Sequence, residues 1–273
     1  MQPASVFQRN IAIPQDHGAW VFLLSPLLIG LFIGKGNVGD VKYLVIAALA
    51  AFLVRQPITI IVKIFANRRA RKYLLSAVFW IVVYGIIGLF SLYQLIAAGN
   101  TYLVWLPIPG IMIFVWYLRL VSRKEERRQQ ILEILASGSL SLAAPAGLWI
   151  SQSYTDNIGW WLWALSWAQA SASILYAFLR LEQRTLLDLP KFKTKLNMGK
   201  IAFGFAGANL GMVILLIFFG ILPGLLWLPF ALQFAETVRG ILNPAIGLKP
   251  TRIGIRQLIV STIFTIMFIQ VWQ

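Results

Sequence analysis

Apolar residues follow one another in long runs through most of this chain, and short polar connectors separate the runs. A helix needs about 20 mostly apolar residues to cross a bilayer. The pattern predicts nine transmembrane helices, near 18–34, 41–62, 74–98, 102–119, 131–151, 158–179, 201–220, 222–242 and 253–272. Because short connectors make neighbouring spans antiparallel, we expect an all-α, polytopic membrane helical bundle.

Composition supports a membrane environment for the whole chain. Of the 273 residues, 59% are hydrophobic and 12% are charged, whereas soluble domains are about a quarter charged. No stretch between the runs is long enough for a soluble domain, so residues 1–273 are expected to form a single transmembrane domain. The absence of cysteine and the single histidine exclude disulfides and histidine-rich metal sites, and we predict no metal and no cofactor.

The net charge of +15 could indicate a protein that binds nucleic acid. The Lys and Arg residues are in short connectors between spans, however, so we expect no nucleic-acid partner. With nine spans, 22 of the 24 basic residues fall on the side of the N-terminus, and only Lys35 and Lys42 fall on the other. Cytoplasmic loops carry the basic excess. We therefore predict a cytoplasmic N-terminus and an external C-terminus, in a plasma (inner) membrane or an internal photosynthetic membrane.

Tryptophans cluster near the ends of two predicted spans, as they do in the aromatic belts of membrane proteins. We interpret them as interfacial anchors and assign them no ligand: Trp105, Trp116, Trp160, Trp161, Trp163 and Trp167.

The first candidate site is the polar start of the first span. Asp16 can cap the helix, and His17 follows it directly. Capping and helix packing are the simpler interpretation, and direct contact with a ligand is the alternative.

The second candidate combines two basic faces. Arg55-Gln56-Pro57 stands where the second span meets its connector, and the proline is expected to kink the helix. Residues spaced by four lie on one helix face, and this spacing relates Arg55, Thr59 and Lys63, as well as Arg180 and Arg184. Two such faces could clamp an anionic head group or a diphosphate. The alternative is that they only follow the charge rule for loops.

The third candidate is a polar stripe in the eighth span, where Glu236 and Arg239 are one turn apart and suited to an intrahelical pair. We expect this stripe, Arg55 and the start of the first span to converge on one cytoplasm-facing cavity. Gln169 and Asn209 also lie within spans, and for them interhelical hydrogen bonds are the preferred interpretation.

Three segments carry a resemblance to a known family. They are IPQDHGAWVFLLSPLLIGLFIG at 13–34, FLVRQP at 52–57 and the basic run RRARKY at 68–73. The sequence resembles the YwiC-like family of bacterial membrane proteins over most of the chain, and this resemblance implies no particular activity.

In architecture the chain is also similar to the UbiA-type intramembrane prenyltransferases. Those enzymes hold Mg²⁺ and an isoprenyl diphosphate with Asp-rich motifs in the second and sixth connectors. Here the corresponding positions are Arg55, Thr59 and Lys63, followed by Arg180, Arg184 and Asp188. Without the carboxylates Mg²⁺ cannot be held in its usual way, so the metal-dependent mechanism is not expected.

These observations lead to a UbiA-like bundle with a basic pocket for an anionic lipid or an isoprenoid, and they leave catalysis open. Membrane lipids and an isoprenoid or quinone-like ligand are the expected partners. The alternatives are a transporter of small molecules or lipids and a non-catalytic factor for membrane-protein assembly.

Overall fold

The computed structural model describes residues 9–14, 17–35, 39–125 and 129–273. Within these ranges the chain is helical and contains no strand, which confirms the all-α prediction. The elements are α1 (Arg9–Ala12), α2 (His17–Gly34), α3 (Val41–Phe65), η1 (Arg71–Tyr73), α4 (Leu74–Ala97), η2 (Thr101–Val104), α5 (Ile108–Arg123), α6 (Gln130–Ser141), α7 (Ala143–Gln152), α8 (Asn157–Gln183), α9 (Phe192–Phe218), α10 (Trp227–Leu242) and α11 (Pro250–Trp272).

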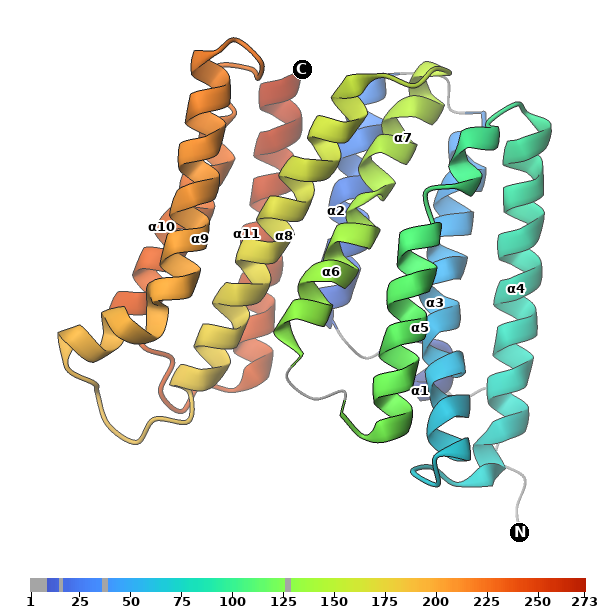
Figure 1. Cartoon of the computed structure of the whole chain (residues 1–273), viewed down its shortest axis with the longest axis horizontal. Helices are drawn as coiled ribbons and strands as arrows, with labels where there is room; N and C mark the ends of the chain where they lie inside the picture. Colours follow the sequence, from blue (N-terminus) through green and yellow to red (C-terminus); the bar gives the residue numbers. More distant parts are fainter. Residues whose placement is uncertain (1–8, 15–16, 36–38, 126–128) are drawn as a thin grey trace.

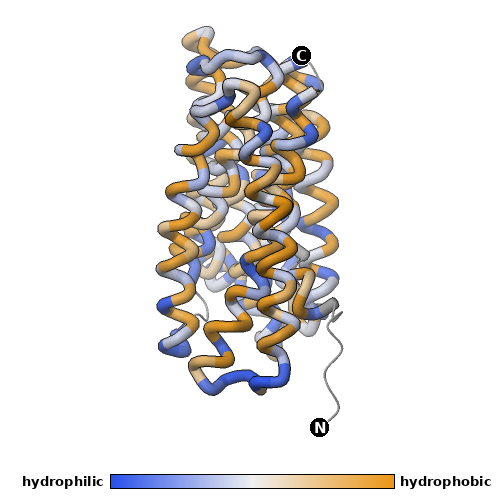
Figure 2. The backbone as a smooth tube through the Cα atoms, turned by 90° about the vertical axis from the view of Figure 1, so that its right-hand side faces the viewer, coloured by the Kyte–Doolittle hydropathy of each residue, from blue (hydrophilic) through white to orange (hydrophobic). Residues whose placement is uncertain are grey.

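Each of the nine predicted spans corresponds to one helix or to two consecutive helices. In the part of the chain that the structure describes, seven helical segments are long and apolar enough to cross a membrane. The other two spans are α2, with 18 residues, and α10, with 16, which are shorter. The chain is therefore a multi-pass membrane protein. Figure 2 shows hydrophobic residues along the length of the helices.

Successive spans run in opposite directions, so the connectors alternate between the two ends of the bundle (Figure 1). The C-terminal ends of α3, α5, α8 and α10 lie at the lower end of Figure 1, which we call the basic end. The C-terminal ends of α2, α4, α7, α9 and α11 lie at the opposite end. The connectors rich in Lys and Arg thus all lie at one end of the molecule, as predicted from the distribution of charge along the sequence.

The helices form two outer groups, and a central group joins them. On one side α3 packs against α4 and α5, and on the other α8 packs against α9, α10 and α11 (Figure 1). Between them α2 packs against α7 and α11. The largest core cluster lies where these groups meet, and it contains Ile29, Leu148, Leu162, Phe230, Phe264 and Phe268.

Two of the predicted spans are interrupted where proline removes a backbone donor. The fourth consists of η2 and α5, and Pro107 and Pro109 lie at their junction. The fifth breaks at Leu142 into α6 and α7. Because Pro145 has no N–H, it cannot bond to the carbonyl of Ser141, and the helix does not continue unbroken.

The second span, predicted at 41–62, corresponds to α3, which continues through the buried Pro57 to Phe65. Thr59 donates a hydrogen bond to the Arg55 carbonyl at 2.8 Å, and Gln56 donates to the carbonyl of Asn10 at 3.2 Å. The polar residues around Pro57 therefore lie inside a continuous helix that packs against α1, and they do not form a connector.

Candidate functional site

A row of buried polar side chains follows one face of α8. Its positions are separated alternately by three and four residues, which is the spacing of a single helix face. The row rises about 25 Å at 1.5 Å per residue, close to the hydrocarbon thickness of about 30 Å. We call it the polar seam, and it consists of Ser166, Gln169, Ser173, Tyr176, Arg180 and Gln183.

Two hydrogen bonds join α8 to the neighbouring helices α11 and α9 within the membrane. Gln169 of the polar seam donates through Nε2 to the Ser261 hydroxyl of α11 at 3.3 Å. On the other flank of α8, Asn209 of α9 donates through Nδ2 to the Ala168 carbonyl at 2.9 Å. The prediction that Gln169 and Asn209 make interhelical hydrogen bonds is confirmed.

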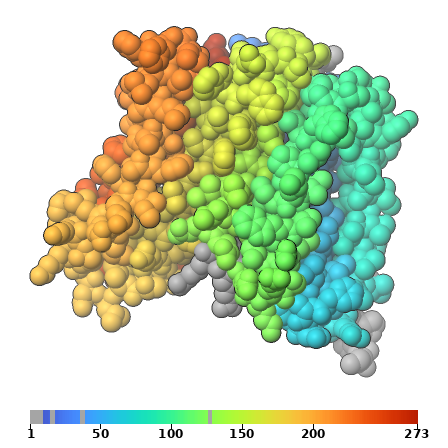
Figure 3. Space-filling model, in the orientation of Figure 1, coloured from blue at the N-terminus to red at the C-terminus, as the bar shows by residue number. Residues whose placement is uncertain are grey.

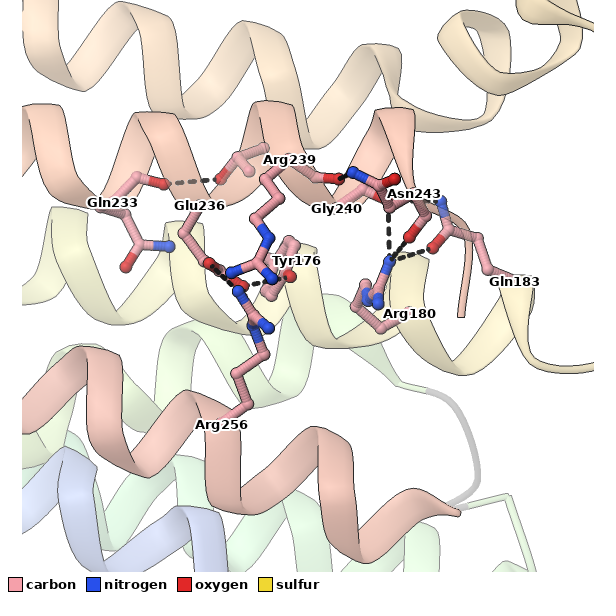
Figure 4. A network of polar contacts seen from close by, with 10 residues as sticks. Tyr176, Arg180, Gln183, Gln233, Glu236, Arg239, Gly240, Asn243 and Arg256 are labelled. Carbon is pink, nitrogen blue, oxygen red and sulfur yellow. Dashed lines mark hydrogen bonds and ion pairs between the residues drawn. The ribbon is translucent and has the colours of Figure 1, made fainter. Parts of the chain in front are cut away.

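A charged cluster occupies the part of the polar seam nearer the basic end (Figure 4). Glu236 of α10 is buried, and its Oε1 accepts from the Tyr176 hydroxyl at 2.7 Å. Arg256 of α11 donates through Nη2 to Oε2 at 2.7 Å and also through Nε to Oε1. Sequence analysis paired Glu236 with Arg239; the ion pair in the structure instead joins Glu236 to Arg256. The planar fork of Arg256 reaches both carboxylate oxygens from the neighbouring helix, whereas Arg239 is exposed.

Arg180 and Gln183 hold the end of α10. The last carbonyls of a helix have no partner within it, and a cation there also complements the helix dipole. Arg180 donates through Nη1 to the carbonyls of Gly240 at 2.8 Å and Asn243 at 2.6 Å, and to Gln183 Oε1 at 2.9 Å. Gln183 donates to the same Gly240 carbonyl at 3.1 Å. This arrangement gives Arg180 a role in fixing α10 against α8.

A small polar space lies beside the Glu236 cluster, but it is packed too tightly to hold a water molecule. Gln233 is buried in its wall, and among the described residues its Oε1 has no hydrogen-bond partner. The lining residues are Ser173, Tyr176, Gln233, Glu236, Gln257 and Val260. In this conformation the polar seam connects helices and offers no room for a ligand.

The candidates on α3 lie in the other half of the bundle. Arg55 is half-buried, with its guanidinium carbon 5.0 Å from the centre of the Phe52 ring. Thr59 is buried, and Lys63 lies half-buried in the last turn of the helix. The i, i+4 spacing therefore places these residues along one continuous helix, as expected.

The structure does not bring the α3 candidates next to Glu236. In the described ranges α3 packs mainly against α4 and α5 and makes no substantial contact with α10 or α11, and Figure 1 shows them on opposite sides of the bundle. Arg184 is exposed and donates through Nε to the Leu248 carbonyl at 3.3 Å. Asp16 lies outside the described residues, and so does the side chain of His17, which begins α2.

A groove with a volume of about 660 Å³ lies toward the opposite end of the bundle. Ligand pockets usually measure about 300–1,000 Å³. The groove runs between α5 and α8 over α6 and α7, on the face that Figure 3 shows. We call it the aromatic groove. Its lining residues are Tyr102, Trp105, Leu106, Pro109, Ile113, Leu135, Gly138, Ser139, Leu142, Trp149, Thr155, Asp156, Asn157, Trp160, Trp163 and Trp167.

Two helix faces form the walls of the aromatic groove. Residues separated by three or four positions share a helix face, and the walls repeat at this spacing. Over eight residues such a wall extends about 12 Å at 1.5 Å per residue. One wall consists of Trp105, Pro109 and Ile113 of the η2–α5 segment, and the other of Trp160, Trp163 and Trp167 of α8.

Two indoles of the groove donate hydrogen bonds to the backbone of α6. Trp163 donates through Nε1 to the Gly138 carbonyl at 2.9 Å, and Trp167 donates to the Ile134 carbonyl at 2.8 Å. Their rings stack with centroids 5.3 Å apart. Both residues therefore fasten α8 to α6, beyond any anchoring in the interface, and the groove presents mainly apolar ring surface.

Asp156 is the only Asp, Glu, Lys or Arg among the lining residues. Its Oδ1 accepts from the Gly159 backbone N–H and from Trp149 Nε1, both at 3.1 Å. The carboxylate thus caps α8 and holds an indole in place. Among the described residues, no group of three or more His, Cys, Asp or Glu side chains could hold a metal ion.

Sequence reasoning missed both the polar seam and the aromatic groove. Each nevertheless has a signal in the sequence, because the seam and the row of Trp160, Trp163 and Trp167 both repeat at three- and four-residue spacing along α8. The tryptophans were interpreted only by their distance from the span ends. Their helical phase, which places them beside α5 and α6, was not used.

Comparison with known families gives one match. Residues 13–147 match the family model described as YwiC-like protein. This range runs from the start of α2 into α7, so it is narrower than the resemblance predicted over most of the chain. No curated protein matches the chain. No solved structure matches it either, so similarity to the UbiA-type enzymes stays a prediction.

Proposed function

We propose that this chain binds an isoprenoid-type membrane lipid in the aromatic groove. The chain is a multi-pass membrane protein and belongs to the YwiC-like family over residues 13–147. The observation that carries the proposal is a cavity of about 660 Å³ walled by indoles. Cavities lined mostly by apolar and aromatic groups, with a few polar atoms, are the usual form of ligand sites.

The groove is accessible from the surface of the bundle. Trp105 is 72% exposed and Trp160 is 48% exposed, and Pro109, in the same wall as Trp105, is exposed as well. In a bilayer this face meets lipid, so a ligand can enter sideways from the membrane. A site of this kind suits a molecule that already resides in the hydrocarbon.

The ring surfaces favour an isoprenoid over a saturated chain. Aromatic rings pack favourably against one another at centroid distances of about 4.5–7 Å, and we expect a weaker preference of the same kind for the π bond of an alkene. An isoprenoid has a double bond in every unit, whereas a saturated acyl chain has none. The groove contains a series of four indoles in which the ring centroids of consecutive members are at most 6.0 Å apart. The series is Trp149, Trp160, Trp163 and Trp167.

The other functions considered have weaker support. Transport along the polar seam would require a wider path than the space beside Glu236. The basic clamp for an anionic head group stays a second candidate, because Arg184, one of its predicted residues, is exposed at the basic end. An assembly factor would not need a cavity of this size.

Binding of farnesol to the purified, reconstituted chain tests the proposal. We expect saturable binding, weakened roughly two- to tenfold by Trp105→Ala or by Trp160→Ala, since an aromatic contact contributes about 0.5–1.5 kcal/mol. Hexadecanol should compete poorly. Equilibrium binding of labelled farnesol in lipid nanodiscs measures the affinity of the wild type, the affinities of the two variants and the competition by hexadecanol.

Trp116→Ala is the matched control. Trp116 lies on α5, is 44% exposed and does not line the groove, so its loss should leave farnesol binding unchanged. Saturable binding that both groove variants leave intact, or the absence of saturable binding, would contradict the proposal. Equal competition by hexadecanol would contradict the isoprenoid preference.

We further infer that the basic end faces the cytoplasm, from the excess of Lys and Arg on that side. The chain contains no cysteine, so single cysteines report their own side. Leu187 is 94% exposed at the basic end, and Tyr154 is 58% exposed at the opposite end. In intact cells an impermeant maleimide should label Tyr154→Cys, and it should label Leu187→Cys only after lysis. The reverse pattern would overturn the orientation.

A further inference from the structure

We infer that the aromatic groove selects an isoprenoid whose head group is uncharged and disfavours an isoprenyl diphosphate. The inference rests on the proposed function and specifies its ligand. It comes from the charges and polar atoms around the groove.

The groove contains a negative charge and no positive one. Asp156 is its only charged lining residue. Lys35 and Lys42 also belong to the opposite end of the bundle, but they follow α2 and begin α3 and do not line the groove. Phosphate is normally bound by Arg or Lys. A diphosphate in this groove would therefore meet a carboxylate with no compensating cation.

The start of α8 could in principle attract an anion, because helix N-termini bind phosphate through their unpaired N–H groups. Here the helix supplies its own anion. Asp156 has extended backbone geometry and accepts from the Gly159 N–H. Since the carboxylate occupies this position, an incoming phosphate gains little from the helix dipole and is repelled by the charge.

The same rim suits a neutral polar head group. Thr155 and Asn157 flank Asp156 and are exposed, while Trp167, Ile113 and Leu135 line the apolar interior. A hydroxyl or carbonyl head group can exchange hydrogen bonds with the rim while the chain lies along the indoles. Asp156 can accept from a hydroxyl, which a fully ionised phosphate does not offer.

Competition between farnesol and farnesyl diphosphate, in the full-length reconstituted chain with a metal chelator present, tests the selection. We expect the wild type to bind farnesol at least tenfold more tightly, and Asp156→Asn to strengthen diphosphate binding by about tenfold. Asparagine is also a good helix cap, so α8 should keep its start, while farnesol binding should weaken because the charged acceptor for its hydroxyl is lost. Higher salt should strengthen diphosphate binding to the wild type, because it screens the carboxylate.

Asp40→Asn is the matched control, because Asp40 precedes α3 at the same end and does not line the groove. It should leave both affinities unchanged. Preference of the wild type for the diphosphate, or an unchanged preference in Asp156→Asn, would overturn the inference and leave the proposed function standing. Failure of both ligands to bind saturably would instead remove the proposed function itself, and the inference with it.

Discussion

Replacing Arg256 by alanine is expected to destabilise the bundle by about 3 kcal/mol, because it leaves the buried Glu236 carboxylate without its counter-charge. Arg256 supplies two of the three hydrogen bonds to that carboxylate, and Tyr176 supplies the third. The loss should appear as a lower midpoint of thermal unfolding in detergent. Arg256→Lys should fall between, since an ammonium keeps the charge without the planar fork.

Arg252→Ala is the control for this experiment. Arg252 lies one turn earlier on α11 and is exposed, so its removal takes away one positive charge from the same end without uncovering Glu236. The double variant Arg256→Gln with Glu236→Gln should recover most of the loss, because two neutral amides can still bond to each other and to Tyr176. Equal stability of Arg256→Ala and the wild type would show that Glu236 does not depend on this ion pair.

The sequence was sufficient to predict the spans, because membrane insertion depends on local properties. Each helix must satisfy its own backbone hydrogen bonds in hydrocarbon, so length and apolar character mark a span without knowledge of its neighbours. The same reasoning predicted that the connectors following α3, α5, α8 and α10 share one end. It could not predict which carbonyls the polar side chains around Pro57 reach, because the bond from Gln56 to Asn10 depends on the packing of α1 against α3.

Partners between helices could not be assigned in the same way. Glu236 and Arg239 are neighbours in sequence, and the nearest possible ion pair was therefore predicted within α10. The choice of Arg256 depends on the packing of α10 against α11, which no local pattern contains. Arg180 was likewise predicted as part of an anion clamp, whereas the structure directs its Nη1 to carbonyls at the end of α10.

The aromatic groove illustrates a third limit. A cavity exists where helices diverge, and that divergence is a property of several helices together. In this chain α5 follows the proline-containing break after η2, and it packs against α3 and α6. The space between α5 and α8 is then filled only in part by indoles. Residue types along α8 can show which face carries tryptophan. They cannot show that the opposite wall, formed by the η2–α5 segment, lies far enough away to leave a groove.

Among the described glycines, Gly30 is the position where replacement by alanine is expected to have the largest effect. A Cβ at Gly30 would overlap the carbonyl oxygen of Ala144 and lie 3.0 Å from the Leu148 nitrogen. These are backbone atoms, which cannot turn aside as a side chain can. The reverse approach is also tight, because a Cβ at Gly147 would lie 3.1 Å from the Leu27 carbonyl oxygen. Small residues permit such contact between membrane helices.

We expect Gly30→Ala to cost about 3 kcal/mol or more, the upper range for overpacking, measured as thermal or denaturant unfolding in detergent. Gly85→Ala is the control, because a Cβ there meets nothing within 4 Å and it lies on α4, away from this contact. Ala144→Gly should not rescue Gly30→Ala, since the overlap involves the backbone oxygen and not the alanine methyl group. Rescue by that second change, or equal stability of Gly30→Ala and Gly85→Ala, would mean that α2 and α7 are not in backbone contact.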